Sequence, residues 1–329
     1  MIDFDNLLYV IGNGFDRHHG VRSSYLDFRD WLKQHHTELY SLYDLINHSD
    51  EKWSNFEAAM PYLGREYFLK IGQAFLPDYN TEPDDWQIAD LLLGGDHVRC
   101  ESERLLSDLL VDLHKWVQSI KPPHNYDDFK LKIDPYARFL SFNYTTFLQS
   151  QYGIEYARIN YIHGNKNDKL GSLILGHNGD SAELFEEWWD KQQYNKVRRN
   201  KQGRRYKKRD FIYHYYEGDS QYLPENEFIT EAVEDYYNDT TKKVKAIIQA
   251  NDAYFQSLHN VRHIYVWGFS FSSVDMPYLK KIAEVNAALE NTKWHISHYT
   301  AEEATLFKQR LHNIGVSIEN IEAKKLSEF

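Results

Sequence analysis

Cysteine is almost absent from the sequence, because Cys100 is the only one among 329 residues. No intramolecular disulfide can form, and no zinc site built from several cysteines is available. A single thiol is typical of a reducing compartment, so we expect a cytoplasmic protein. Long apolar runs are also missing, and the first run, Leu7 to Ile11, is far too short to span a bilayer. We therefore expect no membrane helix, no signal peptide and no membrane partner.

Positive charge is scarce outside one segment. The chain has 38 Lys and Arg against 49 Asp and Glu, a net charge of −11. Residues 196–209, KVRRNKQGRRYKKR, carry nine Lys or Arg and no acid, and removing these nine charges from −11 leaves −20 on the rest. Such a run is most often a solvated loop, but with tyrosines and a phenylalanine close by it also suits nucleic-acid binding. The sequence leaves both interpretations open.

Short apolar runs that stop at turn residues indicate buried parallel strands. Six strands are expected: Leu7 to Ile11, Arg138 to Phe142, Arg158 to Ile162, Ser172 to Leu175, His263 to Trp267 and Trp294 to His298. A seventh is possible near Val316 to Ile321. Helical patterns follow several of them, at Thr146 to Tyr152, Met276 to Leu289 and Glu302 to Ile314. This alternation predicts an α/β fold with a doubly wound, mostly parallel, Rossmann-like sheet that carries helical insertions.

Two long spans are expected to be insertions in one domain that covers residues 1–329. The span 16–134 has apolar residues three or four apart in several stretches and is too long for an ordinary crossover. We expect it to form a helical cover over the ligand edge of the sheet. The second span, 181–260, begins with an aromatic segment, includes the basic run and ends in a helical pattern over 227–258.

The first strand runs directly into Gly12, Asn13 and Gly14, followed by Phe15 and Asp16. Glycines at the end of the first strand of a doubly wound sheet let backbone amides approach a phosphate. The dinucleotide fingerprint is incomplete, since Arg17 occupies the place of its third glycine. A tight turn without a ligand is the alternative.

The next two strands end in residues that are able to do chemistry. Asn143, in the segment SFNYT, has an amide that both donates and accepts hydrogen bonds, although capping of the next helix is the commoner role for such an asparagine. His163, followed by Gly164, is a candidate general base near neutral pH or else a structural histidine. With an ordinary pKa it loses that capacity below about pH 6.5.

Two further loops complete the set: GHNG from Gly176, which includes His177, and GFSFSSVD from Gly268 to Asp275. Both follow expected strands. Because the carboxyl ends of parallel strands share one edge of the sheet, a single ligand at that edge explains all five loops together.

The motifs GNGFD, SFNYT, IHG, GHN and GFSFSSVD, spread from about Leu8 to Tyr278, resemble the AbiH family of bacterial phage abortive-infection proteins. More distantly they are similar to the sirtuin-type NAD-binding fold. The resemblance implies that the glycine loop holds NAD phosphates, that Asn143 binds the ribose or a catalytic water, and that His163 is the base. It also implies that Ser270 and Asp275 contact the adenosine half. The nucleotide-binding set is thus Gly12, Asn13, Gly14, Asp16, Gly176, His177, Gly268, Ser270 and Asp275.

The sequence departs from the sirtuin pattern at two points, and these bear on the reaction and on the nucleotide that we expect. A chain with one cysteine lacks the four-cysteine zinc module of sirtuin deacylases, which argues against protein deacylation. Asn13 and Phe15 also stand where small residues are usual, so the identity of the nucleotide stays open. Fold resemblance alone does not establish a reaction.

Three hypotheses follow for this chain as an anti-phage effector. The first is an enzyme that binds NAD and hydrolyses its nicotinamide–ribose bond. The second is an effector that binds or cleaves nucleic acid through residues 196–209, and the third is a nucleotide-gated interaction protein without catalysis, with a homo-oligomer left open. No metal is expected, because adjacent pairs such as His18–His19 and His35–His36 cannot easily face one ion, and the spacing of His295 and His298 brings no carboxylate partner.

Overall fold

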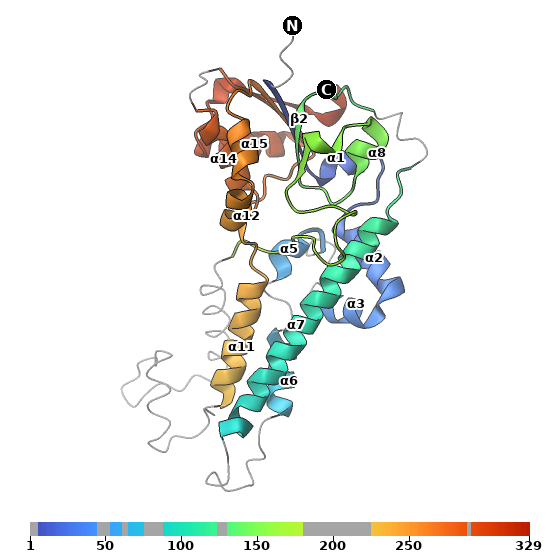
Figure 1. Ribbon diagram of the computed structural model, residues 1–329, viewed down its shortest axis with the longest axis vertical. Helices are drawn as coiled ribbons and strands as arrows, with labels where there is room; N and C mark the ends of the chain where they lie inside the picture. The colour runs from blue at the N-terminus through green and yellow to red at the C-terminus, as the bar shows by residue number, and fades with distance from the viewer. Residues whose placement is uncertain are drawn as a thin grey trace, which may run out of the picture. The chain divides into compact units, whose positions relative to one another are not determined.

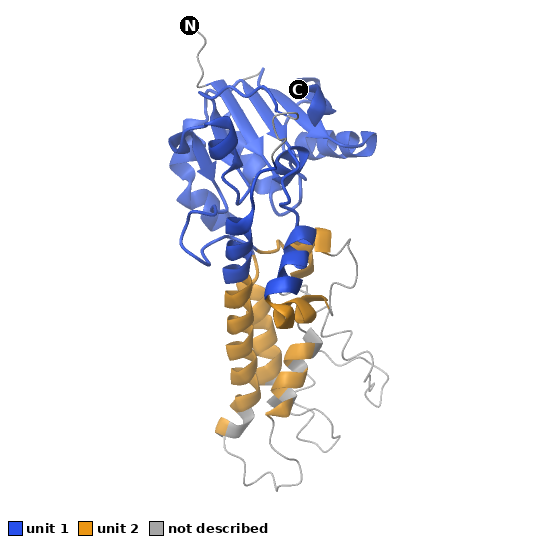
Figure 2. Cartoon of the chain, turned by 90° about the vertical axis from the view of Figure 1, so that its right-hand side faces the viewer, with its two compact units in different colours: residues 1–35, 110–175, 242–329 blue, residues 36–109, 176–241 orange. Residues whose placement is uncertain are grey.

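A computed structural model describes residues 6–44, 53–60, 65–75, 88–123, 130–179, 225–287 and 291–329. The chain divides into two compact units, which Figure 2 shows in different colours. Unit 1 comprises Met1–His35, Leu110–Leu175 and Lys242–Phe329, and unit 2 comprises His36–Leu109 and Gly176–Thr241.

Unit 1 is built on a six-stranded sheet in which every neighbouring pair is parallel. Its strands, in the spatial order β3-β2-β1-β4-β5-β6, are β1 (Leu7–Ile11), β2 (Arg138–Ser141), β3 (Ile159–Tyr161), β4 (His263–Trp267), β5 (Lys293–His298) and β6 (Ile321–Lys325). The predicted α/β, doubly wound parallel sheet is confirmed. The order reverses between β1 and β4, which is the position where open α/β sheets bind ligands.

One predicted strand is wrong. Residues 172–175 form no strand, and the amide of Ile174 donates instead to the carbonyl of His163, in the loop after β3 (2.9 Å). Leu173 is buried, so burial of one side chain explains the apolar run without any ladder. The seventh strand, expected near Val316 to Ile321, lies later as β6, after a short 3₁₀ turn at Ile318–Asn320.

Alternating side chains of the strands pack into two cores, one on each face of the sheet. The first core includes Val10, Val266 and Ile296 and is covered by α13 (Asp252–Ser257), α14 (Met276–Val285) and α15 (Ala301–Asn313). The second includes Tyr9, Ile11 and Trp267, with buried residues from α1 (Asn13–His18) and α8 (Phe147–Tyr152) packed against them. Figure 1 labels α14, α15, α1 and α8 around the strands. Helices on both faces make the sheet doubly wound.

Helix α15 shows how local sequence determines an element boundary. Thr300 accepts a hydrogen bond from the backbone of Glu303, while the Glu303 carboxylate accepts from the amide of Thr300. This reciprocal capping satisfies two amides at the helix start. The pattern predicted for Glu302 to Ile314 is therefore confirmed to within a residue at each end.

The described part of the 16–134 span is helical, as predicted. It contains α2 (Tyr25–His35), α3 (Thr37–Asp44), α5 (Phe56–Ala59), α6 (Arg65–Ala74) and the long α7 (Ile88–Ser119), in addition to α1. Residues of α7 up to Leu109 belong to unit 2, and those from Leu110 belong to unit 1. The expectation that this span covers the ligand edge stays a prediction.

Within unit 2, α6 and α7 pack closely on α11 (Glu225–Asp239) through glycines. A Cβ on Gly72 would lie 2.7 Å from the side chain of Ile229, and one on Gly94 would lie 2.8 Å from the carbonyl of Gly72. The helical pattern predicted for 227–258 is present, but as three helices: α11, α12 (Val244–Ala250) and α13. The basic run 196–209 lies outside the described residues.

Candidate functional site at the carboxyl ends of the strands

The loops after β1 and β4 meet at the point where the strand order reverses. The amide of Gly12 donates to the carbonyl of Trp267 (3.0 Å), and the amide of Gly14 donates to that of Gly268 (2.7 Å). Gly268 has a φ of +61°, and a Cβ built on it would lie 1.9 Å from the nitrogen of Phe15. A Cβ on Gly12 would lie 2.6 Å from the Gly268 carbonyl. These glycines allow two loops to touch along their backbones.

This packing changes what the glycine loop offers to a phosphate. The amides of Gly12 and Gly14, which the sequence suggested as phosphate donors, donate to backbone carbonyls. Asn13 is exposed, and its side-chain oxygen accepts from Ser23 (2.5 Å). Phosphate binding by this loop stays a prediction, and the structure gives the glycines a packing role that requires no ligand.

Asp16 lies at the centre of a buried polar cluster with two residues that follow β2. Its carboxylate accepts one hydrogen bond from Nδ2 of Asn143 (2.9 Å) and another from the Thr145 hydroxyl. Burial raises the pKa of the Asp16 carboxyl to about 6, although the hydrogen bonds from Thr145 and Asn143 act in the opposite direction. Asp16 therefore holds the Asn143 carboxamide and titrates close to neutral pH.

Asn143 is only 6 % exposed, and its orientation is fixed by Asp16. Its other polar atom, Oδ1, is buried and has no hydrogen-bond partner among the described residues. A buried acceptor without a partner is costly and rare in folded proteins. Helix capping does not explain it, because the N-cap of α8 is Thr146. The Asn143 carboxamide is thus an oriented acceptor at the sheet edge.

His163 emerges from the loop after β3 into a mostly enclosed environment. Its Nε2 lies 3.4 Å from the hydroxyl of Tyr278 and 3.9 Å from Oδ1 of Asp275, and its ring packs edge to face on Phe142. Burial, and after it the Lys242 ammonium, lowers the pKa of His163 well below 6.5. The imidazole is neutral at pH 7, which is the state that accepts a proton.

Asp275 links His163 to two more polar groups. It accepts from the hydroxyl of Ser272 (3.0 Å) and lies 3.5 Å from the ammonium of Lys242, whose side chain is fully buried. A carboxylate near the imidazole stabilises its protonated form, while the ammonium opposes that effect. The assignment of Asp275 to the adenosine half of a nucleotide stays a prediction.

Ser270, Gly176 and His177 were also predicted to bind the nucleotide. Ser270 is exposed in the loop after β4. Gly176 and His177 belong to unit 2, where Nε2 of His177 lies 3.3 Å from the hydroxyl of Thr240. Their part in nucleotide binding stays a prediction.

Three residues of the site were not predicted from the sequence. Thr145 lies two residues after Asn143, and apart from this position nothing in the local sequence indicates a role in the site. Tyr278 is buried in α14, so its apolar surroundings conceal its hydroxyl. Lys242 has no local motif at all, and only the fold reveals its proximity to Asp275.

The fold and the site define a class: a doubly wound α/β protein with buried polar residues where its strand order reverses. The family described as Bacteriophage abortive infection AbiH matches residues 8–298. The match spans most of the chain, so the chain belongs to the AbiH family, whose description indicates a role in bacteriophage abortive infection.

Comparison with curated proteins gave no match, and comparison with solved structures gave none either. The more distant likeness to the sirtuin-type fold therefore stays a prediction. Across the described residues, no helix is long and apolar enough to cross a membrane.

Proposed function

We propose that this AbiH-family protein binds NAD or a related nucleotide at the carboxyl ends of β1, β2, β3 and β4 and hydrolyses the bond between nicotinamide and ribose. Loss of NAD in an infected cell would then be the means of abortive infection, acting in the cytoplasm. The observation that carries the proposal is the buried Oδ1 of Asn143, which has no hydrogen-bond partner in the described part of the chain and lies one strand from the reversal of strand order. An acceptor held in this way suits a ribose hydroxyl or an attacking water.

The chemistry requires little acid catalysis. The bond between C1′ of the ribose and the pyridinium nitrogen breaks, its electron pair goes to that nitrogen, and nicotinamide leaves as a neutral molecule. Water forms the new bond to C1′ through an oxocarbenium-like transition state and releases one proton. The products are nicotinamide, ADP-ribose and that proton.

The proposed roles divide between two groups of residues. Asn143, held by Asp16, orients the ribose or the water. His163 accepts the proton, and Asp275 is close enough to stabilise the resulting imidazolium. The proposal does not depend on phosphate contacts by the amides of Gly12 and Gly14.

The test is incubation of the purified protein with NAD, NADP, ATP and RNA, with the products identified by mass spectrometry. We expect nicotinamide and ADP-ribose from NAD, and about 10²- to 10³-fold less of both from the Asn143→Ala variant in the same time. Asn286→Ala is the matched control, because Asn286 is also a buried asparagine whose Oδ1 lacks a partner among the described residues, but at the end of α14. Intact NAD with degraded RNA would favour the nucleic-acid hypothesis.

A second candidate function rests on the sequence of residues 196–209. Nine cations in fourteen residues are able to neutralise several phosphates, which makes binding strongly dependent on salt. Neutralising Lys196, Arg198 and Arg199 together with Arg204 and Arg205 should flatten the salt dependence of RNA or DNA binding and leave NAD turnover intact, because these groups transfer no protons near pH 7.

A further inference from the structure

Two histidines of unit 1 lie on the face of the sheet that carries the second core, at 3.2 Å from each other and away from the site described above. The strands place them there by their period of two. In β4, Ile264 and Val266 enter the first core, so His263 and Tyr265 point to the opposite face. In β5, Trp294 and Ile296 enter the same core, so His295 points to the face of His263.

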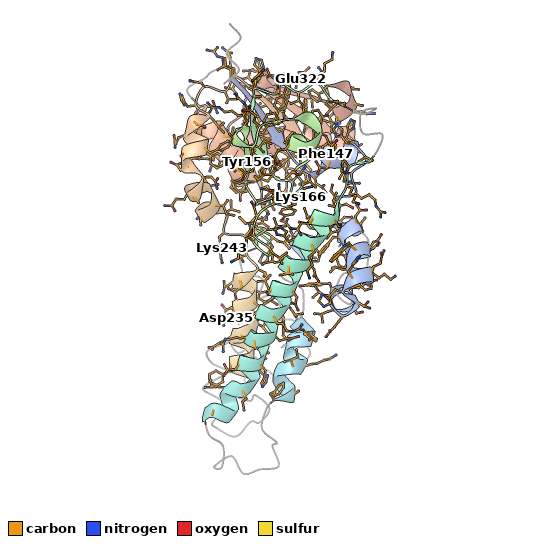
Figure 3. All side chains as sticks on the ribbon, turned by 45° about the vertical axis from the view of Figure 1, so that its right-hand side comes forward. Phe147, Tyr156, Lys166, Asp235, Lys243 and Glu322 are labelled. Atoms are coloured by element: carbon orange, nitrogen blue, oxygen red, sulfur yellow. The ribbon has the colours of Figure 1, made fainter. Side chains whose placement is uncertain are left out.

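The two imidazoles belong to a continuous chain of polar contacts. Nδ1 of His263 lies 3.2 Å from Nε2 of His295, and Nδ1 of His295 lies 2.7 Å from Oε2 of Glu322, which is labelled in Figure 3. The other oxygen of Glu322 lies 2.6 Å from the ammonium of Lys324. A carboxylate only accepts hydrogen bonds, so His295 donates from Nδ1, and in the neutral ring Nε2 then carries a lone pair toward His263.

The separation of the two nitrogens also suits an ion held between them. Two nitrogens bound to a tetrahedral Zn²⁺, each at about 2.0–2.1 Å, lie about 3.3 Å apart. We propose that Nδ1 of His263 and Nε2 of His295 bind a divalent transition-metal ion, with Glu322 holding His295 from outside the coordination shell. A carboxylate on the far nitrogen of a ligating histidine is the usual support for such a ligand.

An aromatic neighbour restrains one of the two imidazole rings. The ring of Tyr265 stacks on His295, with centroids 4.5 Å apart, and limits its rotation. Imidazole ligands favour Zn²⁺, Ni²⁺ and above all Cu²⁺.

Water would complete the coordination, because no group of three or more His, Cys, Asp or Glu side chains in the described part of the chain is arranged to hold a metal. The ion would join β4 to β5 near their amino-terminal halves, since His263 begins β4. The nucleotide site proposed above lies at the carboxyl ends of the strands, so either proposal can fail without the other.

The test is calorimetric titration of the full, chelator-treated protein with Zn²⁺ and with Cu²⁺. We expect the wild type to bind one more equivalent of each ion than His295→Ala, and His259→Ala to match the wild type. His259 is the control because it is an exposed single histidine whose Nδ1 faces a backbone carbonyl. Glu322→Gln should keep the stoichiometry and weaken affinity by about 10- to 100-fold.

Two further measurements separate metal binding from a folding effect. Zn²⁺ should raise the midpoint of thermal unfolding of the wild type but not of His295→Ala, because an ion that binds only the folded state stabilises it. Electron paramagnetic resonance of bound Cu²⁺ should show hyperfine coupling to two nitrogens, and to at most one in His263→Ala. Equal stoichiometry and affinity in wild type and His295→Ala would overturn the proposal and leave the 3.2 Å contact as a hydrogen bond between imidazoles.

Discussion

The carboxamide of Asn143 donates to the carboxylate of Asp16 at 2.9 Å, across 127 positions of sequence. The bond joins the loops after β2 and β1, and it leaves Oδ1 of Asn143 as the atom without a partner among the residues that the structure describes. The proposed function depends on this orientation, because only a held carboxamide presents Oδ1 as an oriented acceptor.

Replacing Asn143 by alanine should reduce NAD cleavage by about 10²- to 10³-fold, which is typical for loss of one positioned polar group that acts on the transition state. Ground-state binding of NAD should change much less, as measured by calorimetry. Asn286→Ala should retain full activity, since Asn286 sits at the C-cap of α14. Equal losses of activity in the two variants would point to a general effect on folding and contradict the role of Asn143.

Asp16 should make the protein less stable as the pH rises from about 4 to 6. Its folded pKa of about 6 lies above the ordinary value of 3.8, so the native state binds more protons in this window and stability falls as the carboxyl ionises. The change is on the order of 3 kcal/mol, at about 1.4 kcal/mol per pH unit. Urea unfolding at several pH values should show a flatter profile for Asp16→Asn than for Asp30→Asn. Identical profiles in both variants would mean that Asp16 is already ionised at pH 4.

His163 should make the protein more stable as the pH rises, which is opposite to the effect of Asp16. Its folded pKa lies well below 6.5, so unfolding takes up a proton as the pH falls below 6.5, and stability is lost there. His163→Gln should therefore lose less stability between pH 6.5 and 5 than the wild type, in the same unfolding assay. The acid limb of NAD cleavage should also lie well below the pH 6.5 expected for an ordinary imidazole. A kinetic pKa near 6.5 that disappears in His163→Gln would contradict the burial argument.

Gly268→Ala should destabilise unit 1 more than Gly153→Ala. Both residues have a positive φ, +61° and +65°, which costs a residue with a Cβ about 1–2 kcal/mol. A Cβ added at Gly268 also clashes with the backbone of Gly14 and Phe15. A Cβ added at Gly153 has no atom within 4 Å. Thermal unfolding measures the difference. Equal losses in the two variants would show that the loops after β1 and β4 separate easily.

The sheet was largely predictable because its strands are continuous apolar runs, and β1 and β4 have the predicted limits. Prediction failed at 172–175, where Leu173 is buried without strand pairing. An apolar run indicates that its side chains are buried. It forms a strand only where a neighbouring strand is available for hydrogen bonding.

The candidate site was predictable as a set of loops but not as a set of contacts. Topology alone brings Asn143 and His163 to the carboxyl edge. The pairing of Asp16 with Asn143, and the proximity of Lys242 to Asp275, depend on packing between distant segments that no local motif encodes. A local motif can also have a second explanation. The glycines that predict a phosphate-binding loop allow the loops after β1 and β4 to pack closely along their backbones.

NAD hydrolysis is tested most directly by the NAD content of phage-infected cells that express the wild type, Asn143→Ala or Asn286→Ala at equal levels. We predict that NAD falls, and nicotinamide and ADP-ribose rise, with the wild type and Asn286→Ala but not with Asn143→Ala. Protection against phage should be lost with Asn143→Ala alone. Unchanged NAD in infected cells that the wild type nevertheless protects would contradict NAD hydrolysis as the function of this site.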